Sequence, residues 1–432
     1  MKSKWRWWLN QVVRRIWFRA TLFSILGVAT ALIAVAVSPY IPRELPTKIG
    51  ADAVDKILGI IASSMLTVTT FSLSTMVSAY SAATTNVTPR ATKLVMEDST
   101  TQNVLATFVG SFLFSLVGII ALTTGAYGDQ GRVILFVVTL GVIILIIVTL
   151  LRWIDHLSRL GRVTETIERV ERATTEALEA WLATPFLGGH RLEENDPRAA
   201  YPNTPIRRDE VGYVQHVDAG VLFEIAEEFD LQIALVATAG KLVAPTIALA
   251  WIVGDAPEEV QKRVASAFTI GDVRSYDQDP RFGAAVMAEI ASRALSQAVN
   301  DPGTAIDVIS RAIRILAIWD KQPTDQEIIY PRLYVAPLRL EDLFDDLFVP
   351  IARDGASILE VALRLQKAFL TLSQFGKAKF KTVALKHSET ALLRSEASAM
   401  IKDDLDRLRP VVAMVRASAK DTSAARAPSQ HP

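Results

Sequence analysis

The sequence predicts an α-helical membrane domain of four transmembrane helices, followed by a soluble α+β domain on the cytoplasmic side of the membrane. Apolar residues make up 50% of the 432 residues, and the long uncharged runs all lie before Arg152. Four of these runs reach the roughly 20 residues that a helix needs to cross the hydrocarbon of a bilayer. Charged residues recur throughout the rest of the chain, which indicates a soluble domain.

The first 19 residues form a basic leader that contains four tryptophans and no acidic residue. Tryptophans interleaved with basic residues favour the interface between lipid and water, so we expect an interfacial helix on the inner leaflet. The apolar run that follows, Ala20–Ser38, is longer than the core of a signal peptide and lacks a clear cleavage site. We therefore interpret it as the first transmembrane helix.

The membrane domain is expected over residues 20–151. The short segment Tyr127–Arg132 contains two glycines and predicts a tight turn between the last two spans. The second, third and fourth spans are expected between Lys56 and Pro89, over Val104–Ala126 and over Val133–Leu151.

The basic loop residues predict the orientation. The leader, the segment with Arg90 and Lys93, and the segment that begins at Arg152 all fall on one side of the membrane. Basic loops stay in the cytoplasm, so both termini are expected there, in a protein of the inner (plasma) membrane. Trp153 is expected to be an aromatic anchor at that interface.

Residues 152–182 predict an amphipathic stalk helix that continues the fourth span. Apolar or small residues recur there at alternating steps of three and four, which is a heptad pattern. This face could drive self-association, or it could pack on the chain's own domain. The residues of the pattern are Leu160, Val163, Ile167, Val170, Thr174, Ala177 and Trp181.

Residues 183–415 predict the cytoplasmic α+β domain, and residues 416–432 predict a disordered tail. Asp218 and Asp301 are expected to cap helices, with Pro302 in the first helical position. The expected order is a loop (184–210), a strand (211–217), a helix (219–229), two strands joined by a turn at Ala239–Gly240 (231–253), three helices (257–269, 283–298 and 303–320), a strand (332–340) and a helical region to 415.

Hydroxyl side chains recur along one face of the second span at helical spacing. Such a face could line a pore, where hydroxyls bind and release ions or water, or it could let membrane helices pack closely. The uncharged run from Ile57 to Pro89 exceeds the length of one span and ends in a polar stretch, which favours a wet pore mouth. In a pore the face points at a central axis, whereas in a simple anchor it is buried against the other spans. The pore-lining candidates are Ser63, Thr67, Thr70, Ser74, Ser78 and Ser81.

No ionisable residue lies inside any expected span, which disfavours proton-coupled transport. Arg90 stands at the cytoplasmic end of the second span. In an oligomer it would form a positive ring at the mouth of the pore. Alternatively, it is an ordinary cytoplasmic anchor.

The residues that could carry chemistry do not form a catalytic pattern. The five histidines are scattered without zinc spacing, and there is no cysteine and no phosphate-binding glycine-rich loop. Zero net charge also gives no indication of a nucleic-acid partner. We therefore expect no enzyme, no cofactor and no metal. One polar group around two helix starts could form a crevice for an anion or a small ligand, or simply cap helices: Arg274, Asp277, Asp279, Asn300 and Asp301.

Three stretches carry a resemblance to a known family: Phe71–Ala91, Gly212–Asp218 and Asp279–Ala305. They resemble a bacterial family of predicted inner-membrane proteins that is known only as a domain of unknown function. The resemblance extends from the first span to about residue 400. In that family a proline often replaces Gln297 and a larger residue replaces Gly303. The resemblance implies the membrane topology and supplies no catalytic residue and no substrate.

These observations lead to two functional hypotheses. The first is an oligomeric, channel-like pore in the lipid bilayer, lined by the second span and regulated by the cytoplasmic domain. The second is a membrane-anchored scaffold or sensor whose cytoplasmic domain binds a ligand or a protein. The expected partners are lipids, further copies of the chain, and ions or a small ligand.

Overall fold

The computed structural model describes Thr21, Ile25, Ala29 and residues 51–96, 98–124, 129–321, 327–375 and 377–424. The chain divides into two compact units, with the boundary between Glu165 and Thr166. We call the helices before this boundary the membrane unit and residues 166–432 the C-terminal domain. The predicted leader and nearly all of the predicted first span lie outside the described residues.

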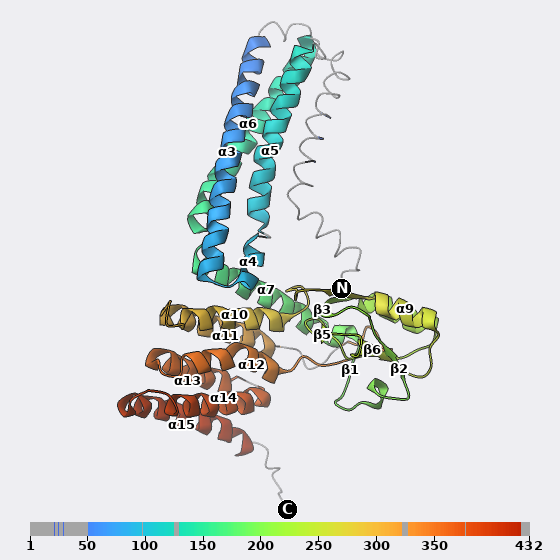
Figure 1. Ribbon diagram of the computed structural model, residues 1–432, viewed down its shortest axis with the longest axis vertical. Helices are drawn as coiled ribbons and strands as arrows, with labels where there is room; N and C mark the ends of the chain where they lie inside the picture. The colour runs from blue at the N-terminus through green and yellow to red at the C-terminus, as the bar shows by residue number, and fades with distance from the viewer. Residues whose placement is uncertain are drawn as a thin grey trace, which may run out of the picture. The chain divides into compact units, whose positions relative to one another are not determined.

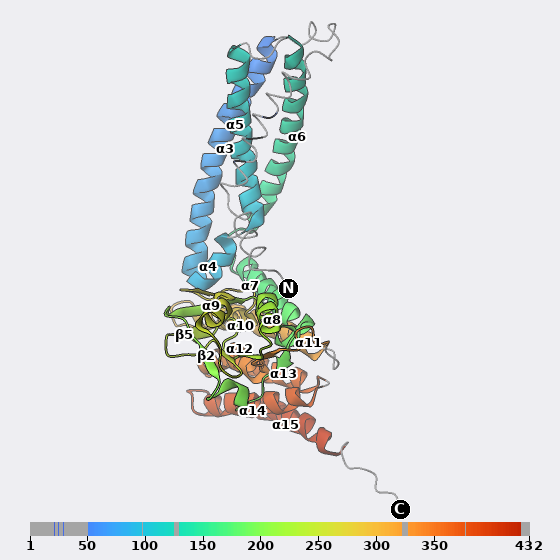
Figure 2. The ribbon, with the colours of Figure 1, turned by 90° about the vertical axis from the view of Figure 1, so that its right-hand side faces the viewer.

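Among the described residues, three helices of the membrane unit are long and apolar enough to cross a bilayer, with candidate spans at Ala53–Ala82, Ser99–Thr123 and Val133–Arg159. They correspond to the second, third and fourth predicted spans and lie side by side (Figures 1 and 2). A short helix, α4, follows the first of them. The bounds are α3 (Ala51–Asn86), α4 (Pro89–Met96), α5 (Ser99–Thr123) and α6 (Asp129–Arg159).

Small side chains let α3 and α5 approach closely. A Cβ added to Gly118 of α5 would lie 3.0 Å from the Leu58 side chain of α3, which is tighter than an ordinary contact, so a larger residue would require Leu58 to move. Close approach through small residues is the usual basis of helix packing in membranes. Buried apolar side chains from α3, α5 and α6 complete the contact, among them Met65, Phe108 and Ile146.

The predicted stalk helix is interrupted. α6 ends at Arg159, and Gly161 adopts φ +83, a left-handed conformation that suits glycine and ends helices. A separate helix, α7 (Val163–Ala183), follows the break. Sequence periodicity missed the break because the heptad pattern continues across it.

The heptad face of α7 is buried within the C-terminal domain. Ile167 and Val170 are at most 1% exposed. A Cβ on Gly283 of α10 (Pro280–Ala294) would collide with the Thr174 hydroxyl, so α7 and α10 are in close contact. Of the two readings of this face, the structure therefore favours packing on the chain's own domain over self-association.

Two small sheets form the β part of the C-terminal domain. The larger has the strand order β1-β8-β4-β6-β2, with β1 and β4 parallel to β8, and β6 antiparallel to β4 and β2. The smaller is antiparallel, in the order β5-β3-β7. The strands are β1 (His190–Arg191), β2 (Thr204–Ile206), β3 (Gly212–Val217), β4 (Ile233–Leu235), β5 (Leu242–Val243), β6 (Ala250–Ile252), β7 (Phe268–Gly271) and β8 (Leu333–Val335).

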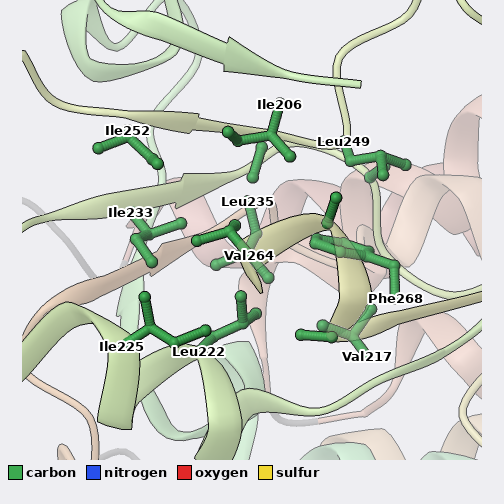
Figure 3. Packing of buried hydrophobic residues seen from close by; sticks show 14 of the residues in the cluster. Ile206, Val217, Leu222, Ile225, Ile233, Leu235, Leu249, Ile252, Val264 and Phe268 are labelled. Atoms are coloured by element: carbon green, nitrogen blue, oxygen red, sulfur yellow. The ribbon is translucent and has the colours of Figure 1, made fainter. Parts of the chain in front are cut away.

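The core of this part lies between the sheets and two helices, α8 (Ala219–Glu228) and α9 (Glu258–Ser266). Figure 3 shows Leu222 and Ile225 of α8 directed toward Ile233 and Leu235 of β4. The Asp218 side chain accepts a hydrogen bond from the Val221 amide at 3.2 Å, which confirms the predicted helix cap.

Several sequence-based assignments in this part were wrong. The segment 231–253 is not one hairpin, because β4 pairs in the larger sheet whereas β5 pairs in the smaller one. The predicted helix to Thr269 ends at Ser266 and is followed by β7. The predicted loop 184–210 contains β1 and β2. In each case the strands are too short for a periodic signal, and distant partners determine the pairing.

Six further α-helices in the described part of the C-terminal domain stack in successive layers (Figure 1). Asp301 caps α11 and Pro302 occupies its first turn, as predicted. α15 continues to Ala424, so residues 416–424, predicted to be disordered, are helical. The helices are α10 (Pro280–Ala294), α11 (Pro302–Asp320), α12 (Leu340–Asp354), α13 (Leu359–Ser373), α14 (Ala378–Glu396) and α15 (Lys402–Ala424).

Candidate functional site

The six pore-lining candidates form one exposed stripe along α3, which we call the hydroxyl stripe (Ser63, Thr67, Thr70, Ser74, Ser78 and Ser81). The residues of α3 that are buried in the membrane unit lie on the opposite side of the helix, as the three-and-four spacing requires. They include Leu58, Met65 and Met76. The stripe is therefore not covered by α5 or α6.

A buried hydrogen bond holds α3 in this rotation. The indole Nε1 of Trp153 on α6 donates to the Ser72 hydroxyl at 2.9 Å, and both side chains are at most 2% exposed. The Trp153 ring stacks on His156, whose Nε2 lies 3.0 Å from the Asp98 carboxylate. The expectation that Trp153 is an interfacial anchor was wrong, because the ring is enclosed by α3, α5 and α6.

Three hydroxyls of the stripe donate to the backbone of their own helix. Ser63, Thr67 and Thr70 each donate to a backbone carbonyl one turn earlier, at 3.0 Å. This bond lowers the cost of placing a hydroxyl in an apolar environment, and the oxygen keeps acceptor capacity toward its surroundings. The stripe can thus present weak acceptors without a net charge.

Arg90 lies in the first turn of α4 and is exposed. Its backbone amide donates to the Thr88 hydroxyl at 3.1 Å. The position just after α3 is compatible with both interpretations of this residue, a positive ring or an anchor.

The predicted polar crevice is divided between the two ends of α10. Arg274 binds the Asp279 carboxylate through two hydrogen bonds, of 2.8 and 3.0 Å, at the start of the helix. Asp277 lies nearby and accepts from the Ser275 hydroxyl at 2.9 Å. Asn300 and Asp301 lie beyond the far end, about 20 Å away for a helix of this length. The five residues therefore do not form one site.

Arg274 and Asp279 do line a cavity of about 410 Å³ in the C-terminal domain. Burial raises the pKa of Asp279 above its ordinary value, and the Arg274 guanidinium acts in the opposite direction. The sequence did not indicate Trp181 or Lys241 as part of this site, because they are distant in sequence from Asp279 and no spacing rule connects them. Arg281 also lines the cavity and lies only two residues after Asp279, but no pattern in the sequence singled it out. Within the described ranges, no group of three or more His, Asp or Glu side chains could hold a metal ion.

Comparison with known proteins places these features in a family. The family model described as "Predicted membrane protein (DUF2254)" matches residues 13–371. Uncharacterized proteins of Mycobacterium bovis (Mb1321c) and Mycobacterium tuberculosis (Rv1290c) are each 30% identical over 262 residues, which is 59% of this chain and 50% of the relative. The chain thus spans about half the length of the curated relatives it matches. No solved structure matches it. The chain belongs to the DUF2254 family of predicted membrane proteins.

Proposed function

We propose that the chain assembles into a homo-oligomeric, channel-like pore that is lined by the hydroxyl stripe of α3 and regulated by the C-terminal domain. The observation that carries this proposal is the exposure of all six stripe hydroxyls on the side of α3 that faces away from α5 and α6. Polar oxygens on a membrane helix are stabilised by hydrogen bonds to water or to another helix, whereas lipid chains offer them no hydrogen-bond partner.

Symmetric copies would bring several stripes around one axis. Their hydroxyl oxygens would offer an ion or water a series of weak, uncharged acceptors, which favours release as well as binding. Arg90 would contribute one positive charge per copy at the end of the path. We propose that this end faces the cytoplasm of a cell whose inner membrane holds the protein, with both termini on the same side.

Flux through liposomes tests the proposal. Thr70→Leu and Ser74→Leu should narrow and dewet the path while folding is preserved, because leucine suits a membrane helix. Gly141→Leu is the matched control, since Gly141 is exposed on α6 and a Cβ there meets no atom within 4 Å. Potassium, sodium and chloride flux is measured for each variant beside its thermal stability in detergent and its mass by light scattering.

The pore proposal is supported if the wild type is an oligomer that conducts ions. In addition, both stripe variants must lose flux at unchanged stability, and the control must conduct normally. If the stripe variants instead lower stability or yield, the stripe packs between helices and lines no path. A monomeric wild type, or one without flux for any of the three ions under voltage, refutes the pore.

A second function is favoured by a separate observation, the cavity of about 410 Å³ in the C-terminal domain. Cavities of this size hold small molecules in many proteins. In this alternative the membrane helices are an anchor and the C-terminal domain is the sensor. A protein that binds a small ligand but conducts no ion would support this alternative over the pore.

A further inference from the structure

The cavity of the C-terminal domain is built at the carboxyl ends of two neighbouring parallel strands. β4 ends at Leu235 and β8 ends at Val335, and the two strands pair directly. The segments that follow them, 238–241 and 335–338, form two walls of the cavity. Ligands of sheets with parallel strands commonly bind outside the carboxyl ends, where the chain leaves each strand. The location alone therefore marks this cavity as a candidate ligand site.

One wall of the cavity depends on a glycine. Gly240 adopts φ +91, and a Cβ there would collide with the Asp279 carboxylate. The turn can therefore lie directly against the ion pair between the buried Asp279 and the partly exposed Arg274. This contact holds Lys241, the next residue, at the same cavity.

The charges of the cavity favour an anion. Three cationic side chains line it (Lys241, Arg274 and Arg281), against two carboxylates (Asp279 and Asp342). Both carboxylates are already bound, by Arg274 and by Arg281 respectively. Arg281 also pairs with Asp346, which lies outside the lining, so the charge of Arg281 is compensated and Lys241 carries the positive charge that is left for a ligand. Lys241 donates to the Val236 carbonyl at 3.0 Å but forms no ion pair with any residue in the described part of the chain. Its ammonium keeps two donors for a ligand.

Aromatic and apolar side chains form the remainder of the lining. Trp181 stacks on Trp319 with ring centroids 5.4 Å apart, and this contact fixes its indole at the edge of the cavity. Leu187 and Leu338 add apolar surface. An aromatic wall next to a cationic group suits a ligand with a flat body and one acidic group.

We propose that this cavity binds a small aromatic anion of about mononucleotide size. Its phosphate or carboxylate lies against Lys241 and the outer face of Arg274, and its ring lies against Trp181 and Leu338. The proposal does not depend on the pore, because every residue of the cavity belongs to the C-terminal domain. Within the pore hypothesis it supplies the regulatory ligand.

Isothermal titration calorimetry on the full chain in detergent tests the proposal. The probes are AMP and indole-3-acetate, which carry a phosphate and a carboxylate, their neutral counterparts adenosine and indole-3-acetamide, and inorganic phosphate alone. We expect at least one aromatic anion to bind, and to bind at least tenfold more tightly than its neutral counterpart and than inorganic phosphate.

Two variants locate the binding. Lys241→Met keeps the length of the side chain and removes its charge. It should weaken binding of the anion about tenfold or more, since a charge-assisted hydrogen bond is lost. Leu338→Trp fills the cavity and should abolish binding. Lys262→Met is the matched control, because Lys262 is an exposed lysine of α9 paired with Glu258, and it should leave the affinity unchanged.

Each alternative result overturns the proposal. If neither aromatic anion binds at millimolar concentration, the cavity is not the site proposed. If a neutral counterpart binds as tightly as its anion, the cationic side chains of the cavity do not select the ligand. Unchanged affinity in both Lys241→Met and Leu338→Trp would place the ligand elsewhere. Flux measurements address the pore separately, so a failure of one proposal is distinguishable from a failure of the other.

Discussion

The hydrogen bond between Trp153 and Ser72 provides a direct test of how α3 is oriented. The bond is 2.9 Å long, joins α6 to α3 and is buried at both ends. If it is formed, it fixes which side of α3 packs in the membrane unit and hence which side carries the hydroxyl stripe. The perturbations are Ser72→Ala, Trp153→Phe and the double variant.

The expected magnitudes follow from the burial of both groups. Ser72→Ala leaves the indole N–H without its acceptor and should cost about 1 kcal/mol. Trp153→Phe should cost more, on the order of 2 kcal/mol, because it also leaves a void beside Phe108 and Ile146. The double variant loses the bond only once. The coupling energy between the two positions should therefore be about 0.5–1.5 kcal/mol.

The assay is SDS-induced unfolding in mixed micelles, followed by circular dichroism because two of the variants lack the Trp153 fluorophore. Ser74→Ala is the matched control, since Ser74 is a serine of the same helix on the exposed side. It should change stability by less than about 0.5 kcal/mol and show no coupling to Trp153→Phe. Additive costs for Ser72→Ala and Trp153→Phe, or a coupling at Ser74 instead, would refute the orientation of α3 and remove the basis of the pore proposal.

Two further predictions concern topology and pH. A reporter that fluoresces only in the cytoplasm should be bright when fused after Pro432 or near Leu94 and dark when inserted within residues 39–48, because the basic loops fall on one side. A dark C-terminal fusion would reverse the proposed orientation. His387 is buried against Phe344 in the C-terminal domain, and burial lowers its pKa from 6.5 to about 4. The unfolded chain therefore takes up the proton first, so the free energy of unfolding should fall as the pH is lowered from about 6.5 to about 4, by at most roughly 3 kcal/mol. His387→Leu should flatten this part of the pH–stability curve in detergent, and a curve of unchanged slope would contradict the assignment.

Local patterns in the sequence predicted the features that depend on one segment alone. Uncharged runs of spanning length predicted three helices that the structure describes, since transfer into hydrocarbon depends on the composition of the segment. The positions of Asp218 and Asp301 predicted two helix caps, because a cap involves residues three apart. The three-and-four spacing likewise predicted that the stripe hydroxyls share one side of α3.

Only the tertiary structure decided what depends on partners distant in sequence. Ser72 and Ser74 are serines of the same helix, only two residues apart. The bond to Trp153, 81 residues away, makes Ser72 an internal residue and leaves Ser74 exposed. The heptad of α7 predicted a buried face, and the fit of Thr174 against Gly283 determined that this face is buried within the chain.

The cavity shows the same limit most clearly. Its lining comes from segments between Trp181 and Asp342, and no single segment carries more than part of the site. The sequence indicated Arg274 and Asp279 as polar residues near a helix start, but it could not bring Lys241 or Trp181 to them. Strand pairing and helix packing bring them together, and these depend on long-range contacts that a local pattern does not encode.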